Sequence, residues 1–360
     1  MSHAPGMRDP SLVPEVLFAI PGDLATPTGG YRYDRRVMDE LKQFGWKATL
    51  LALPGDFPSP SAASLRETER LLDATPDDAL ILFDGLAYGA LPSELLDNVP
   101  RRYVALVHHP LALETGLTAA RVTEFMTMER EALARAMRVV ATSQTTADLL
   151  ARDFGVPKDR ISVAEPGTEP ATRARGNIGL ARLLGVGAVT RRKGFDTLAD
   201  ALGLIREIEW ECHIVGSLDR DGDAATQLKN QIARLNLEER IKLLGSITDE
   251  QLAAEYDHAT LFVLPSHFEG YGMAFAEAIA RGLPIVACLG GAVMKTVPPD
   301  AAVFIPAGDA NALAEKLRWL LSNPSEIKKR ADEAWYRAEK LPRWRDTARE
   351  IAITLEKALA

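Results

Sequence analysis

Cysteine is nearly absent from this sequence, which contains only Cys212 and Cys288. Both lie in or beside short apolar runs typical of strands, where a free thiol behaves as a small hydrophobic side chain. Neither a disulfide framework nor a cysteine-rich metal cluster is therefore expected.

Long hydrophobic runs are also missing. No stretch reaches the roughly eighteen uninterrupted apolar residues of a membrane-spanning helix. Residues 1–14 are polar, and the apolar run 16–20 is too short for the core of a signal peptide. We expect no transmembrane segment and a cytoplasmic location, and peripheral contact with the inner membrane surface stays open.

Positive charge is not in excess. The sequence has 42 Lys and Arg and 50 Asp and Glu residues, which gives a formal net charge of -8. Proteins that bind nucleic acid without sequence preference normally present a strongly basic face. A nucleic-acid partner is therefore not expected. Local basic clusters, such as 191–193, are either solvated surface or phosphate-binding groups.

The length of 360 residues exceeds what one hydrophobic core normally supports, so two domains are expected. Apolar runs of strand length alternate with amphipathic runs of helix length, which predicts parallel α/β sheets. A polar, Pro- and Gly-containing stretch at 165–177 interrupts this pattern and is the predicted linker. The expected domains are residues 1–168 and 177–340, each doubly wound and Rossmann-like, and residues 343–359 form a separate final helix. The expected strands are 16–20, 48–53, 79–83, 103–107, 139–142, 161–163, 181–186, 212–215, 241–243, 261–264, 284–287 and 303–305.

The most informative segment runs from the predicted strand 261–264 to Gly282. Gly270 and Gly272 permit a tight loop, and 273–281 is a predicted helix. Free amides at such a loop favour a phosphate. Glu269 on the loop and Glu277 on the helix could accept hydrogen bonds from a sugar and from a ribose. Together these features indicate a nucleotide-sugar site, although an isolated pair of glutamates at this spacing is often only solvated charge.

The text around the two glutamates is LPSHFEGYGMAFAEAIARGLPIVA, residues 264–287. It resembles the signature of the retaining glycosyltransferases of family 4. The resemblance implies a GT-B fold, in which two doubly wound domains face each other across a cleft and the final helix, 343–360, packs back on the first. The first domain would bind the acceptor and the second the nucleotide sugar. By this resemblance Glu269 touches the donor sugar, Glu277 holds the ribose hydroxyls, and amides around Tyr271, Gly272 and Met273 bind the diphosphate.

The start of the second domain matches the family in part. The family carries an arginine after the glycine that follows the first strand, and a lysine before the next glycine, and both neutralise the diphosphate. Lys193 matches the lysine, but Ala188 replaces the arginine. Whether Arg191 or Arg192 fills that place is open, and a solvated turn is the alternative.

Two later loops resemble those that line the nucleobase pocket of the family. Gly216 follows the predicted strand 212–215. Ile247 lies in the loop after the predicted strand 241–243, and its backbone would contact the base. Such glycines are also common in any turn between a strand and a helix, so the identity of the base is not predicted from them.

In the first domain, Gly29 and Gly30 open a helix after the first strand, where missing side chains allow a ligand to approach. A plain strand-to-helix turn is the alternative. His108 and His109 end the fourth strand, and the family often has a histidine here that contacts the donor sugar. We select His109 by position only, with Glu114 as an orienting partner or acceptor-site residue. A structural histidine is the alternative.

No cofactor and no obligatory metal are expected, because His108, His109 and His267 lack the spacing of a metal motif. A nucleoside diphosphate leaves as a stabilised anion, so positioning and neutralisation matter more than protonation by a carboxyl group. The predicted catalytic residues are accordingly His109, Lys193 and Glu269.

The resemblance predicts transfer of a hexose from a UDP-sugar, or next a GDP-sugar, with retention of configuration. The acceptor is the hydroxyl of a lipid, a glycan or a small molecule, and the sequence does not identify it. A sensor that binds nucleotide sugars without turnover, suggested by Ala188, and a GT-B epimerase are the alternatives.

Overall fold

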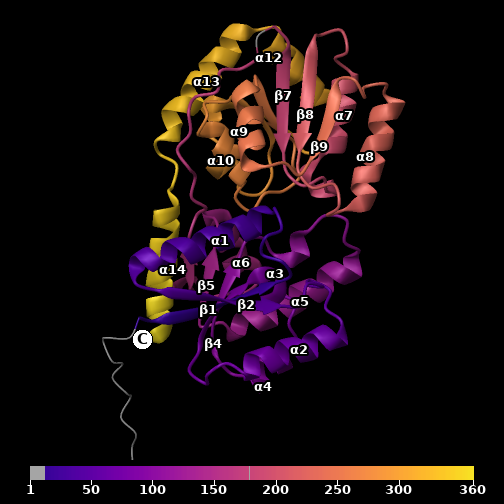
Figure 1. Cartoon of the computed structure of the whole chain (residues 1–360). Coiled ribbons are helices and arrows are strands. Elements are labelled where there is room, and N and C mark those ends of the chain that lie inside the picture. The colour runs from indigo at the N-terminus through magenta and orange to yellow at the C-terminus, as the bar shows by residue number, and fades with distance from the viewer. Residues whose placement is uncertain (1–12, 178) are drawn as a thin grey trace, which may run out of the picture.

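The structure is a computed structural model that describes residues 13–177 and 179–360, and these residues form two α/β domains (Figure 1). Each domain is built on one six-stranded parallel sheet with helices on both faces. The strand orders are β2-β1-β3-β4-β5-β6 and β12-β11-β10-β7-β8-β9. Both orders reverse once, between β1 and β3 and between β7 and β10. Ligands of open α/β sheets bind outside the carboxyl ends of strands at such a reversal.

The first sheet consists of short strands that pair only with parallel neighbours, and its central strands β3 and β4 are buried. All five residues of β3 are buried, as expected for strands covered on both faces. The strands are β1 (Glu15–Pro21), β2 (Lys47–Leu53), β3 (Leu80–Asp84), β4 (Arg102–Val107), β5 (Arg138–Ala141) and β6 (Ile161–Val163). The helices are α1 (Gly29–Leu41), α2 (Ala62–Asp73), α3 (Gly85–Tyr88), α4 (Ser93–Asn98), α5 (Ala119–Arg135) and α6 (Gln144–Asp153).

The second sheet has the same construction, and one continuous hydrophobic core surrounds it. Its strands are β7 (Ala181–Val186), β8 (Trp210–Val215), β9 (Ile241–Gly245), β10 (Leu261–Leu264), β11 (Ile285–Cys288) and β12 (Ala302–Ile305). Its helices are α7 (Phe195–Gly203), α8 (Gly222–Arg234), α9 (Asp249–His258), α10 (Met273–Ile279), α11 (Val293–Thr296), α12 (Ala310–Leu321) and α13 (Pro324–Ala338).

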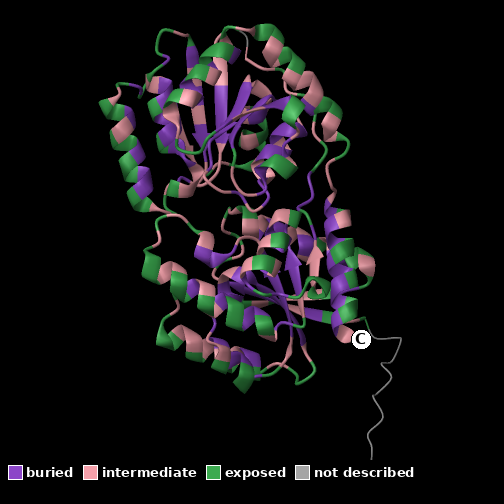
Figure 2. Ribbon diagram, turned by 180° about the vertical axis from the view of Figure 1, so that it is seen from behind, coloured by how far each residue is buried: buried purple, intermediate pink, exposed green. Residues whose placement is uncertain are grey.

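The last helix, α14 (Trp344–Leu359), leaves the second domain and packs on the first (Figure 1). Trp344, Ile351 and Leu355 join the core layer under β1, and Figure 2 shows the buried face of this helix turned toward the sheet. The chain crosses itself here, since a Cβ at Gly167 would lie 2.2 Å from the backbone nitrogen of Trp344. Only glycine fits this crossing of the linker and the final helix.

All twelve predicted strands are present, and their ends differ from the predicted ones by at most two residues. Helix α5 begins at Ala119 and ends at Arg135. Thr118 caps it by accepting a hydrogen bond from the amide of Arg121, a start signal that the apolar pattern alone does not give. Among the described residues no helix is both long and apolar enough to cross a membrane.

Candidate functional site

The loop between β10 and α10 lies at the strand-order reversal of the second sheet and carries Glu269. Gly272 has a left-handed φ of 93°, and a Cβ there would lie 2.7 Å from the ring of Phe275, so the loop requires glycine at this point. The carbonyl of Glu269 accepts a hydrogen bond from the amide of Ala292 at 2.8 Å. The loop after β11 therefore fixes the backbone that presents the Glu269 carboxylate.

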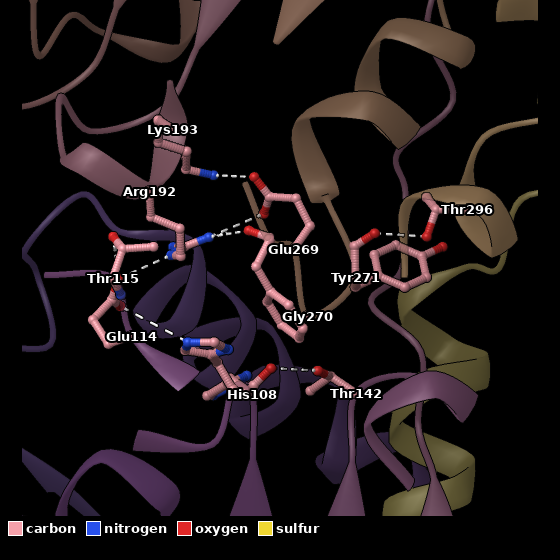
Figure 3. A network of polar contacts seen from close by, with 12 residues as sticks. His108, Glu114, Thr115, Thr142, Arg192, Lys193, Glu269, Gly270, Tyr271 and Thr296 are labelled. Atoms are coloured by element: carbon pink, nitrogen blue, oxygen red, sulfur yellow. Dashed lines mark hydrogen bonds and ion pairs between the residues drawn. The ribbon is translucent and has the colours of Figure 1, made fainter. Parts of the chain in front are cut away.

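Two cations hold the Glu269 carboxylate (Figure 3). Nζ of Lys193 lies 2.7 Å from Oε1, and Nη1 of Arg192 lies 3.5 Å from Oε2. Glu269 is only 5% exposed. Burial alone would raise the pKa of Glu269, but the charges of Lys193 and Arg192 and a hydrogen bond from Lys193 lower it to about 2. The carboxylate is therefore ionised at neutral pH.

Arg192 also ties the two domains together. Its Nη1 donates to the carbonyl of Phe268 at 2.7 Å, and its Nε lies 3.3 Å from Oε1 of Glu114 in the first domain (Figure 3). Arg191 lies instead against the first-domain turn at Gly116, where a Cβ would be 3.6 Å from its Cδ. Of the two arginines that follow Ala188, Arg192 is thus the one that brings charge to Glu269.

Glu277 on α10 faces the first domain. Its Oε1 accepts a hydrogen bond from Nη1 of Arg32 at 2.6 Å, and its Oε2 accepts one from the hydroxyl of Tyr256 at 3.0 Å. Sequence reasoning did not select Arg32 or Tyr256. Arg32 comes two residues after Gly30 and so had a local signal, whereas no motif marks Tyr256.

The remaining second-domain candidates lie at the carboxyl edge of the same sheet. Gly216 has a φ of 149°, and a Cβ there would lie 2.1 Å from the carbonyl oxygen of Gly187, so the two loops touch backbone to backbone. The amide of Gly216 donates to the carbonyl of Gly245 at 2.9 Å. Ile247, two residues further on, is half-buried and packs on the second-domain core. These loops are therefore adjacent, and their contact with a nucleobase stays a prediction.

Gly29 and Gly30 lie between the two domains at the start of α1. A Cβ at Gly29 would be 3.9 Å from Sδ of Met273, and one at Gly30 would be 3.6 Å from Cδ2 of His108. Across the same interface, a Cβ at Gly270 would be 2.2 Å from the carbonyl oxygen of His108. The glycine turn and the glutamate loop therefore approach each other from opposite domains.

His109 lies in this interface, with its ring centroid 4.9 Å from that of Phe268. Its Nε2 is 3.9 Å from Oε2 of Glu114, and neither ring nitrogen has a hydrogen-bond partner among the described residues. Burial and the charge of Arg192 lower the pKa of His109 to about 4, so the imidazole is neutral. His108 points elsewhere, to Asp34, with 3.0 Å between Nε2 and Oδ1. His109 thus has two free polar atoms at the interface, and its role stays a prediction.

Comparison with known protein families gives two matches. The model described as "Glycosyltransferase Family 4" matches residues 28–172, and the one described as "Glycosyl transferases group 1" matches residues 175–338. Together the two models cover every strand of both sheets except β1, and every residue of the site described above.

Two characterised relatives indicate the same grouping. The chain is 27% identical over 322 residues to the MMP alpha-(1->4)-mannosyltransferase of Mycolicibacterium hassiacum, which covers 84% of this chain and 76% of the relative. It is 30% identical over 177 residues to the mannosylfructose-phosphate synthase of Agrobacterium fabrum, which covers 44% and 39%.

Solved structures share the fold. Sucrose-phosphate synthase from Thermosynechococcus elongatus superposes with a TM-score of 0.80 at 21% identity, over 94% of this chain and 97% of that one. The Anabaena protein HepE, crystallised with UDP and glucose, gives a TM-score of 0.77 at 17% identity, over 95% and 99%. The two-domain architecture is therefore the GT-B fold.

Proposed function

This chain belongs to the group 1 glycosyltransferases of family 4, and we propose that it transfers a hexose from a UDP-sugar to a hydroxyl acceptor with retention of configuration. One observation carries the proposal. The two glutamates of the donor signature, Glu269 and Glu277, lie between the domains, and each is already held by a cation at 2.7 Å or less.

The proposed donor site uses groups that are paired with each other in the absence of a donor. The diphosphate would lie against the loop amides from Tyr271 to Met273, and Lys193 and Arg192 would neutralise it. The ribose hydroxyls would bind Glu277 in place of Arg32, and Tyr256 keeps the second carboxylate oxygen in position. HepE was crystallised with UDP and glucose, which supports a UDP-sugar as the first choice, ahead of a GDP-sugar.

Glu269 cannot act as the acid of a glycosidase-type reaction, because a carboxyl group with a pKa of about 2 carries no proton at neutral pH. Transfer from a nucleoside diphosphate does not require one, since the leaving group is a stabilised anion. The acceptor oxygen forms its bond to C1 of the sugar as the bond from C1 to the phosphate oxygen breaks. The proton of the acceptor passes to the departing phosphate. We propose that this reaction needs no obligatory metal and no enzyme nucleophile.

His109 supplies a neutral imidazole beside the proposed sugar position. Because both ring nitrogens lack partners among the described residues, one can donate to and one can accept from sugar hydroxyls. Glu114 contacts both Arg192 and His109 and so links the phosphate side of the site to the sugar side. The acceptor class stays a lipid, a glycan or a small molecule. We place the reaction in the cytoplasm, with peripheral membrane contact if the acceptor is a lipid.

A donor screen tests the proposal. The full chain is mixed with UDP-, GDP- and ADP-glucose and with UDP- and GDP-mannose, and the melting temperature and the release of free nucleotide are measured. A ligand at a hundred times its dissociation constant stabilises a protein by about 2.7 kcal/mol. We expect a UDP-sugar to stabilise the chain and to be consumed only when an acceptor is present. If none of the five sugars stabilises the chain or is consumed, the proposal fails.

The second candidate function is a nucleotide-sugar sensor, which Ala188 at the family's arginine position favours. Binding of a donor without consumption across a broad panel of acceptors would support the sensor. A third outcome, conversion of the donor to its epimer without an acceptor, would identify an epimerase. Arg192 at 3.5 Å from Glu269 favours the transferase, because it restores the cation that Ala188 removes.

A further inference from the structure

Three potential metal ligands from three different elements meet at the carboxyl edge of the first-domain sheet. Asp84 ends β3, His108 follows β4, and Asp34 lies on α1. Nε2 of His108 is 3.0 Å from Oδ1 of Asp34 and 4.0 Å from Oδ2 of Asp84. One ligand atom from each residue lies within 4.8 Å of the other two. Such a cluster lies beside the reversal of strand order between β1 and β3.

Both carboxyl groups of this cluster are withdrawn from water. Asp34 is 0% exposed and Asp84 is 2% exposed. Oδ2 of Asp34 is buried without a hydrogen-bond partner among the described residues. Asp84 accepts a hydrogen bond from the amide of Leu86 at 2.6 Å. Within the described part of the chain, no lysine or arginine lies within ion-pair distance of either carboxyl group.

The two buried carboxyl groups lie within hydrogen-bonding reach of each other and beside the imidazole of His108, and no lysine or arginine of the described residues pairs with either. A buried carboxylate is stable when it is paired, when it coordinates a metal or when it takes up a proton. Carboxylate oxygens together with an imidazole nitrogen are ligands that Zn²⁺ takes, and three protein ligands leave one position of a tetrahedral site open.

We propose that Asp34, Asp84 and His108 bind one Zn²⁺ ion on the first-domain side of the interface. All three ligands belong to the first domain, whereas the donor groups Lys193, Glu269 and Glu277 belong to the second. The three ligands are far apart in the sequence, 50 residues from Asp34 to Asp84 and 24 from Asp84 to His108. No spacing motif marks such a site, which explains why no metal was expected from the sequence.

The test measures metal uptake directly on the full, untagged chain after dialysis against EDTA. Titration calorimetry with ZnCl₂ and metal analysis of the desalted complex are expected to give one equivalent. The melting temperature is expected to rise by at least about 3 °C at a hundredfold excess over the dissociation constant. MnCl₂ in a parallel titration reports the selectivity for the softer ion.

The isosteric variants Asp34→Asn and Asp84→Asn each remove one ligand. Both are expected to lose the equivalent of zinc and the rise in melting temperature. Asp39→Asn is the matched control, since Asp39 lies on the same helix and is exposed beside Lys42. It is expected to bind zinc as the parent does. Asp34→Asn is also expected to keep the stabilisation by a UDP-sugar, so that a failure here is distinguishable from a failure of the donor site.

Two results would overturn the proposal. One is the absence of zinc uptake by the parent chain, which would mean that the two carboxyl groups hold a proton instead of a metal. The other is equal zinc uptake by the parent, Asp34→Asn and Asp84→Asn, which would place the metal elsewhere on the chain.

Discussion

Arg32 of the first domain donates a hydrogen bond to Glu277 of the second, with 2.6 Å between Nη1 and Oε1. The side chain of Arg32 is 36% exposed and that of Glu277 is 15% exposed. Under the proposed function, the ribose binds this same carboxylate oxygen. Arg32 therefore occupies the position of a ribose hydroxyl, and a donor that enters the site must displace it.

This competition predicts a large loss of donor affinity when Glu277 is changed and a small one when Arg32 is changed. Glu277→Gln is expected to weaken the binding of UDP-glucose at least tenfold, because hydrogen bonds to a charged group contribute about 1.5–3 kcal/mol. Arg32→Ala is expected to change the affinity less than about fivefold, because a partly exposed ion pair contributes about 0–1 kcal/mol. Calorimetry of both variants measures this. If Arg32→Ala loses as much affinity as Glu277→Gln, Arg32 itself binds the donor.

Lys193 has two separable effects, on stability and on transfer. Removing it leaves Glu269 buried with only Arg192 at 3.5 Å, so Lys193→Ala is expected to destabilise the fold by up to about 3 kcal/mol. Transfer is expected to fall at least about a hundredfold, since the diphosphate loses a cation. Urea denaturation and initial rates measure the two effects.

Two further variants separate the charge from the packing. Lys193→Met with Glu269→Gln removes both charges and is expected to recover much of the stability, but none of the transfer. Lys329→Ala is the control, because Lys329 is exposed on α13 and forms no ion pair with the described residues. A double variant that transfers sugar at the parent rate would exclude both residues from the reaction.

Gly270 lets the backbones of the two domains touch, because a Cβ at this position would lie 2.2 Å from the carbonyl oxygen of His108 in the other domain. Gly270→Ala is therefore expected to hold the domains apart, raise the radius of gyration in solution scattering and lower kcat at least tenfold. Gly222→Ala is the control, since nothing lies within 4 Å of a Cβ there. Parent-like scattering and parent-like kcat for Gly270→Ala would show that closure does not depend on this contact.

Glu129 makes the stability of the first domain depend on pH. It is 2% exposed, and its Oε2 accepts a hydrogen bond from the amide of Ala112 at 3.2 Å. Burial raises the pKa of Glu129 to about 7, although backbone hydrogen bonds oppose the shift. Between its unfolded pKa of 4.5 and about 7, the folded chain holds a proton that the unfolded chain has lost. Stability is therefore expected to fall as pH rises through this window.

Glu129→Gln removes that proton and should flatten this part of the pH dependence. The expected difference between parent and variant grows by about 1.4 kcal/mol for each unit of the pKa shift. Urea denaturation at pH 5 and pH 8 measures it. Glu131→Gln, an exposed glutamate on the same helix, serves as the control. If the stability of the parent and of Glu129→Gln depends on pH equally, burial does not raise the pKa of Glu129.

The configuration of the product tests the proposed course of the reaction. Attack from the same face as the departing diphosphate predicts that an α-linked donor gives an α-linked product. NMR coupling constants at the anomeric carbon of the product report this directly. A β-linked product would contradict retention while leaving the donor site intact.

The fold was predictable because its signals are local. Continuous apolar runs such as 261–264 mark buried parallel strands, and Pro342 marks the start of the final helix. The exact start of α5 depends instead on its capping threonine, Thr118, which an apolar pattern does not reveal. Such caps shift the ends of elements by single residues and do not change the order of the elements.

Contacts between the domains were not predictable, because they join residues that no periodicity relates. The pair of Arg32 and Glu277 spans 245 positions. Within the second domain, the pair of Lys193 and Glu269 was accessible only through the resemblance to a family. The local sequence predicts which side chains lie on loops. Which of these side chains contact each other depends on how the two domains pack, and the local sequence does not predict that.

A crystal structure of the chain with an intact UDP-sugar tests the donor site most directly. We expect the diphosphate at the amides of Tyr271 to Met273 beside Nζ of Lys193, and the ribose hydroxyls on Glu277 in place of Arg32. A UDP-sugar bound outside the domain interface, or bound while Arg32 still holds Glu277, would contradict the proposed site.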